Sequence, residues 1–247
     1  MSWFAFGFRA VATAVIAAIS VVSTLPAVEL TVPAVASKAG DGPDGKGNTA
    51  DDTWQFWFNL AHLPGQYRRL DLHSTTSPAG IPGKVTGPVA AATPNPADTQ
   101  GWIYHSDWDG RFEGFWGDAK AGQVLAHPYN EKVFAGDVAV TYLVPADGAY
   151  DVSGKVSYMR GANAGPKAGI RCKVGVCSGG PEQIGGDLNW LSNTTAGAPG
   201  DSGVTEFKSA GVPLKKGQVV MLAIDANGFW GADMTRIDAF NVEPAAK

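Results

Sequence analysis

Hydrophobic and polar residues alternate over short runs through most of the second half of the chain. The run Asp137–Val144 is followed by the turn Pro145–Gly148, and alternation resumes over Ala149–Tyr158. Proline and glycine stand where a tight turn favours them, so the pattern predicts a β-hairpin. The segment Gly179–Gly203, rich in small polar residues, is interpreted as a loop. Further strands are expected at Gly169–Val176, Val204–Ser209, Gln218–Asp225 and Arg236–Val242.

The first half of the chain has a weaker pattern. Thr53–Leu60 carries large apolar side chains at successive positions, which is typical of a central strand covered on both faces. Looser alternation over Val28–Ser37 and Tyr67–His73 predicts two more strands. The segments between them are loops: Lys38–Asp52 is rich in glycine, and Ser74–Asp98 contains five prolines.

The pattern predicts an all-β protein. No stretch after residue 27 has the apolar periodicity of a helix longer than two turns. Short strands, frequent turns and 32 glycines among 247 residues favour an antiparallel β-sandwich. We expect an N-terminal β segment over residues 28–122 and a sandwich over residues 123–247, or one continuous domain over residues 28–247.

The first residues are typical of a signal peptide. Arg9 precedes an apolar run from Ala10 to Val22, which is short for a bilayer span and suited to an export signal. Cleavage after Ala27 would leave a secreted, periplasmic or cell-surface protein that is not inserted in the membrane. The alternative is an uncleaved membrane anchor.

Net charge and cysteine content narrow the possible partners and predict how the cysteines are bonded. The formal net charge is −4 and no basic cluster appears, which argues against a nucleic-acid partner. The two cysteines, Cys172 and Cys177, predict a local disulfide in an exported protein. Five positions apart on a straight strand they would face opposite ways, so the bridge requires a turn, which Gly175 would supply.

Aromatic residues and carboxylates gather over residues 101–118. Indole rings stack on the apolar C–H faces of sugars, and carboxylates accept hydrogen bonds from sugar hydroxyls. The alternative is that these rings fill the core, although we expect Trp108 and Trp116 to be exposed. A second aromatic pair between two glycines is expected at a loop tip. The candidate ligand-binding residues are Trp102, Trp108, Asp109, Glu113, Trp116, Phe229 and Trp230.

Two oxygen-rich clusters are candidate calcium sites. Calcium binds six to eight oxygens from carboxylates, amides and carbonyls. One cluster contains Asp107 and Asp109, and the other contains Asp225, Asn227 and Asp233. The alternative is that these are ordinary solvated turn residues. The sequence therefore predicts calcium as a candidate cofactor.

Three segments of the second half resemble a known family. The hairpin with Pro145 and Gly148, the Lys215–Asp225 strand and the Asp233–Phe240 strand are similar to those of secreted bacterial jelly-roll modules of the galactose-binding-like, carbohydrate-binding type. This resemblance implies a jelly-roll-like sandwich and a carbohydrate partner, a polysaccharide or a cell-surface glycan. Residues 28–122 resemble only uncharacterised exported bacterial proteins.

Catalytic motifs are weak. Gly200–Gly203 resembles the nucleophile motif of trypsin-like proteases, but no histidine stands in a suitable context for a triad. The best hypothesis is an exported, non-catalytic carbohydrate-binding protein. The alternatives are a glycan-active hydrolase that uses carboxylates near residues 107–113 and a structural protein of the cell envelope.

Overall fold

The structure is a computed structural model. It describes residues 26–38, 47–60, 65–70, 72–74, 99–105, 112–119, 121–128, 136–159, 169–197, 202–227 and 234–246. Residues 1–25 of the predicted signal peptide lie outside these ranges.

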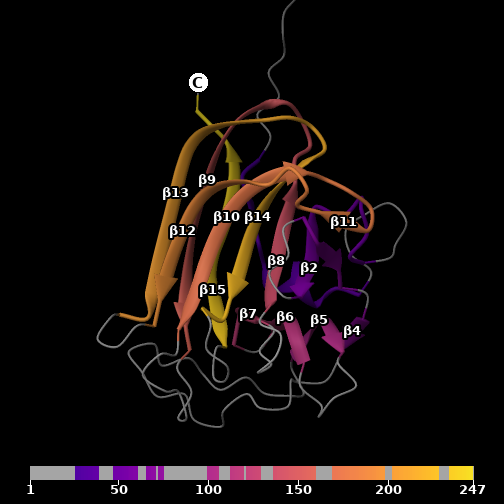
Figure 1. Cartoon of the computed structure of the whole chain (residues 1–247), viewed down its shortest axis with the longest axis vertical. Coiled ribbons are helices and arrows are strands. Elements are labelled where there is room, and N and C mark those ends of the chain that lie inside the picture. Colours follow the sequence, from indigo (N-terminus) through magenta and orange to yellow (C-terminus); the bar gives the residue numbers. More distant parts are fainter. Residues whose placement is uncertain are drawn as a thin grey trace, which may run out of the picture.

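The described residues form two antiparallel sheets, which pack face to face as a sandwich (Figure 1). The eight-stranded sheet has the order β13 (Val204–Leu214), β9 (Gly148–Tyr158), β15 (Thr235–Pro244), β7 (Gln123–His127), β6 (Phe112–Asp118), β5 (Thr99–His105) and β4 (Leu72–Ser74), with β1 (Val28–Glu29) paired to β15. The seven-stranded sheet has the order β11 (Gln183–Ile184), β3 (Tyr67–Arg69), β2 (Trp54–Leu60), β8 (Gly136–Leu143), β14 (Gln218–Asp225), β10 (Ile170–Ser178) and β12 (Asn189–Ala196).

Successive strands of the second half cross between the sheets. β8, β10 and β14 belong to the seven-stranded sheet, whereas β9, β13 and β15 belong to the other. This alternation gives the jelly-roll-like plan, and the predicted all-β antiparallel sandwich is confirmed. Each sheet also contains strands from before and after residue 122.

The core lies between the inner faces of the two sheets. Val138 and Val140 of β8 point inward with Leu222 of β14, while Val152 of β9 faces them from the other sheet. Aromatic rings span the gap. The ring centroids of Trp54 and Phe240 are 5.5 Å apart, a tilted contact of the kind that aromatic pairs prefer.

The first predicted strand, Val28–Ser37, is wrong beyond Glu29. After β1 the chain forms the short helix α1 (Val32–Ala36), with Pro33 in its first turn. Proline is tolerated there because the first helical N–H groups have no partner within the helix. Val35 is fully buried, and α1 packs on β5 and β6. Within the described ranges, no helix is long and apolar enough to cross a bilayer.

Two other segments differ from their predictions. The expected strand Tyr67–His73 divides into β3 and β4, which belong to different sheets. The chain changes sheets after Leu70, whose backbone N–H donates to Phe56 O. The expected loop Gly179–Gly203 contains β11 and β12. β12 is a half-exposed edge strand with mostly polar side chains. Its sequence therefore has the composition of a loop.

The predicted disulfide between Cys172 and Cys177 is wrong. β10 pairs with β14 without interruption from Arg171 to Ser178, so Gly175 makes no turn. Residues five apart on such a strand face opposite sides. Cys172 lies in the core between the sheets, and Cys177 lies in a second apolar cluster on the outer face. Both cysteines are free and buried.

We expect both thiols to be unreactive in the folded chain. Burial raises the pKa of each thiol to about 12, and the thiolate is the reacting form. A thiol-specific reagent at about pH 8 should therefore modify neither cysteine until denaturant is added, and should then modify both without any reductant. Thiols that appear only after reduction would contradict the structure.

Candidate functional site

The outer face of the seven-stranded sheet carries a second set of buried residues. Ala139 of β8 and Met221 and Ala223 of β14 alternate with the core residues and point away from the core. Trp57 of β2 shares this face, is fully buried, and donates its indole N–H to Thr141 Oγ1 at 2.9 Å. The outer face is therefore packed in part, and its polar groups have defined partners.

A buried ion cluster lies on this face. Lys173 Nζ is 2.6 Å from Asp137 Oδ2 and 3.3 Å from Asp225 Oδ2. Asp137 and Asp225 are cross-strand partners on β8 and β14, and both are buried. Two carboxylates this close repel each other unless a cation lies between them, and Lys173 supplies that cation.

Tyr67 completes the cluster. Its hydroxyl donates to Asp137 Oδ2 at 2.5 Å. Burial and, secondarily, the negative charge of Asp137 raise the pKa of Tyr67 above its ordinary value. The phenol therefore stays protonated and remains a donor, so Asp137 accepts from two groups at once.

Among the described residues, Trp190 is the one large apolar residue that is exposed, with 42% of its surface accessible. Its indole lies over Gly175, where a Cβ atom would be 2.9 Å from the ring atom Cε3. Lys173 Nζ lies 5.2 Å from the ring centroid, within the range of a cation–π contact. Gly175 and Lys173 thus hold the indole against the sheet.

Trp190 faces outward because β12 contains a bulge. Cys172 pairs with Thr194 and Val174 pairs with Ser192, but Gly175 then pairs with Trp190. The extra residue, Leu191, reverses the alternation. Without it Trp190 would stand opposite the inward-facing Val176.

Polar residues continue from Trp190 along the same side of β12. Asn193 pairs with Lys173 and Thr195 pairs with Arg171, and cross-strand partners point to the same face of a sheet. Both residues are exposed. We call Trp190, Asn193 and Thr195 the β12 strip. It lies at the edge of its sheet, beside β10 (Figure 1).

The predicted aromatic segment forms the hairpin of β5 and β6, with Trp102 opposite Phe115 and Gly101 opposite Trp116. The expectation that Trp116 is exposed is wrong, because it has no accessible surface. Trp102 is 6% exposed and contacts the ring of His73 edge-on at 5.1 Å. A buried indole has no free face for a sugar, so this hairpin offers no platform from these two rings.

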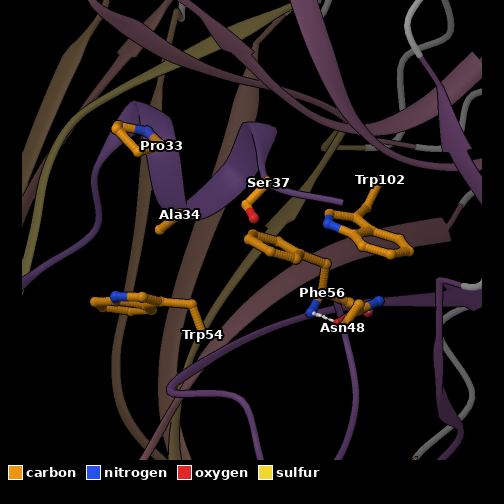
Figure 2. Close-up of a pocket in the computed structure, with 7 residues that line it drawn as sticks. All are labelled: Pro33, Ala34, Ser37, Asn48, Trp54, Phe56 and Trp102. Carbon is orange, nitrogen blue, oxygen red and sulfur yellow. Dashed lines mark hydrogen bonds between the residues drawn. The ribbon is translucent and has the colours of Figure 1, made fainter. Parts of the chain in front are cut away.

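Trp102 also lines a cavity of about 270 Å³ (Figure 2). The cavity lies between α1 and the inner side of β2, and Trp54 and Phe56 project into it from β2. Asn48 stands beside them and is held by the backbone of Phe56. The cavity is thus separate from the outer face that carries Trp190.

The other predicted ligand-binding residues Trp108, Asp109, Phe229 and Trp230, and the side chain of Glu113, lie outside the described residues. Trp190 was missed. A signal for it is present in the sequence, because Asn189–Ala196 combines a tryptophan with β-branched residues. The glycine-rich segments around it favoured the interpretation as a loop.

The second candidate calcium cluster has other partners where it is described. Besides Lys173, Asp225 accepts from the backbone N–H of Asn227 at 2.7 Å. The side-chain oxygen of Asn227 accepts from Arg171 Nη2 at 2.9 Å. These oxygens already face N–H donors, which fits a calcium ligand set poorly.

The remaining candidate ligands, Asp107, Asp109 and Asp233, lie outside the described residues. In the part of the chain that is described, no three histidine, cysteine or acidic residues gather as a metal site. Calcium binding stays a prediction from the sequence.

Comparison with known proteins gives similarity of fold. No protein-family model matches the chain, and no curated protein matches it. Among solved structures it is similar to a family 61 carbohydrate-binding module in complex with β-1,4-galactotriose, at 12% identity and a TM-score of 0.31, covering 60% of this chain and 82% of that one.

Two further structures are similar to the same degree. A family 35 carbohydrate-binding module from Clostridium thermocellum has 14% identity and a TM-score of 0.29, with 60% of this chain and 89% of that chain covered. An adhesin domain of Lys-gingipain from Porphyromonas gingivalis has 15% identity and a TM-score of 0.33, with 50% and 74% covered. The solved structures that the chain resembles thus include carbohydrate-binding modules, as its sequence predicts, and the likeness is one of fold.

Proposed function

We propose that the chain is a non-catalytic carbohydrate-binding protein that acts outside the cell or at its surface, and that its ligand stacks on Trp190. The observation that carries the proposal is the exposed indole seated on Gly175. A large exposed aromatic side chain on a rigid strand supplies contact area at low entropic cost. A pyranose ring presents a flat C–H face of matching shape.

The rest of the β12 strip supplies the polar contacts. Asn193 carries an amide that both donates and accepts, and Thr195 carries a hydroxyl that does the same. Sugar hydroxyls need partners of both kinds. The positive charge of Lys173 is already matched by Asp137 and Asp225. The strip therefore favours a neutral glycan over an anionic one.

The conformation of the Trp190 side chain is set in advance. The ion cluster holds Lys173, and Lys173 lies against the indole. A side chain that is ordered before binding loses less entropy when the ligand arrives. The strip also runs along the strand, so an extended polymer could contact the tryptophan and the two polar residues with successive units.

Replacing Trp190 by alanine should remove most of the affinity. Truncation of a central aromatic residue in a binding surface costs about 2 kcal/mol or more, which corresponds to roughly a 30-fold weaker Kd. The measurement is retention of the purified chain on a panel of soluble and insoluble polysaccharides, including galactan, xylan, mannan and cellulose. Trp190→Ala should lose retention on the polymer that the natural chain binds.

The matched control is Lys155→Ala. Lys155 is exposed on the eight-stranded sheet, where it pairs with Glu206, and its loss should leave retention unchanged. Failure of the natural chain to bind any polymer, or equal retention of Trp190→Ala, would contradict the proposal. Calcium and a chelator in parallel arms test the predicted cofactor, and sugar released into the supernatant would favour the hydrolase hypothesis.

A further inference from the structure

We propose that the cavity beneath α1 binds a small, neutral, largely aromatic molecule of about ten non-hydrogen atoms with a single polar atom. The cavity is walled by Trp54, Phe56 and Trp102 together with Pro33 and Ala34 of α1 (Figure 2). It lies on the inner side of β2 and opens beside α1, away from the β12 strip. This site is therefore independent of the carbohydrate surface.

The size of the cavity sets the size of the ligand. Protein interiors pack densely and hold few voids larger than a water molecule, yet this cavity measures about 270 Å³. An engineered apolar cavity of about 150 Å³ accommodates benzene, which has six non-hydrogen atoms. By proportion, this cavity accommodates about ten such atoms.

The lining sets the chemistry of the ligand. Three of the described lining residues are buried aromatic side chains, and none of the described lining residues is charged. A charged molecule would lose its hydration there without gaining a partner. An aromatic ring, in contrast, would contact the indole and phenyl groups in the tilted or offset geometries that such rings prefer.

The polar groups are too few for a sugar. Asn48 donates from Nδ2 to the carbonyls of Phe56 and Leu70, and its Oδ1 accepts from the N–H of Phe56 at 2.6 Å. Its amide hydrogens are thus engaged by the backbone. In Figure 2 the hydroxyl of Ser37 and the indole nitrogen of Trp102 lie on the same side of the Phe56 ring. The indole N–H matches one polar atom of a ligand, whereas a monosaccharide carries several hydroxyls.

The cavity has an opening beside α1. Pro33 lines it and is exposed, whereas Val35 on the other side of the same helix is fully buried. α1 has only five residues, and no side chain caps its first turn. A ligand can therefore enter along the exposed side of the helix while Val35 keeps the helix anchored.

The test uses 2-naphthol and toluene as probes, with glucose as the sugar control, and follows tryptophan fluorescence and the Tm of the full chain. Both probes should bind saturably and raise the Tm, since a ligand that binds only the folded state stabilises it. Glucose should have no effect. Absence of saturable binding by both probes, or equal binding of glucose, would overturn the proposal.

Filling the cavity tests its location. Ala34→Phe should weaken 2-naphthol binding at least tenfold, while Ala149→Phe, which adds the same ring at an exposed position of β9, should not. Trp190→Ala should bind 2-naphthol normally, which separates this site from the carbohydrate proposal. Should Ala34→Phe not fold, Ser37→Leu replaces it, and crystals under xenon give an independent result. A xenon atom between Trp54 and Trp102 would support the site, and its absence there would overturn it.

Discussion

Asp137→Ala is expected to lower the free energy of unfolding by about 3 kcal/mol, because two buried donors lose their acceptor. Lys173 would lose the carboxylate at 2.6 Å, and the Tyr67 hydroxyl would lose its acceptor. Asp225, at 3.3 Å, would remain the only carboxylate among the described partners of Lys173. Urea denaturation followed by tryptophan fluorescence measures the change.

Two further variants separate the ion pair from simple truncation. Lys173→Met should cost at least as much as Asp137→Ala, because the buried Asp137 and Asp225 would then repel each other without the cation between them. Lys155→Ala removes one partner of an exposed pair with a 3.0 Å contact, and should cost less than about 1 kcal/mol. If Asp137→Ala costs no more than Lys155→Ala, the cluster does not stabilise the fold as we infer.

Gly175→Ala is expected to weaken carbohydrate binding roughly tenfold, equivalent to about 1.4 kcal/mol. The added Cβ would lie 2.9 Å from Trp190 Cε3, 2.9 Å from Leu188 Cδ1 and 3.0 Å from Asn189 O. Carbon atoms in contact prefer about 3.5–4.0 Å. The indole would therefore have to lift from the sheet, and its contact with Lys173 would change. Polysaccharide affinity measures this effect.

Gly186→Ala is the matched control for this substitution. A Cβ atom at Gly186 would meet nothing within 4 Å, so its binding should equal that of the natural chain. Circular dichroism and denaturation should confirm that both variants fold. The result contrary to our expectation is equal affinity of the two variants, which would mean that the seating of Trp190 on Gly175 does not matter for the ligand. This prediction rests on the proposed function.

Much of the sandwich can be predicted from short-range patterns. The strand predicted over Thr53–Leu60 appears as β2, and Gln218–Asp225 appears as β14 with the same bounds. Both segments carry dense apolar residues, and both are central strands with neighbours on each side. The pattern was sufficient there because a strand covered on both faces carries apolar side chains at nearly every position. Such a continuous apolar run is visible in the sequence.

Edge positions and surface chemistry were harder to predict. Val28–Ser37 alternates like a strand, yet only its first two residues pair with β15, and a helix with Pro33 in its first turn follows. The aromatic segment suggested exposed rings, but Trp116 is fully buried. The sequence pattern shows which residues share a face of a strand. It does not show whether that face is covered by the core, by another segment or by water.

The sequence by itself determined the class of the fold and the residues that alternate within each strand, because the strand period of two depends only on the backbone. The tertiary structure alone decided which side each residue faces. The bulge at Leu191 turns Trp190 outward, and the unbroken pairing of β10 separates Cys172 from Cys177. Both outcomes depend on register with a neighbouring strand, and a shift of one residue reverses every side chain. Register is set by contacts between residues far apart in the chain, which no local pattern contains.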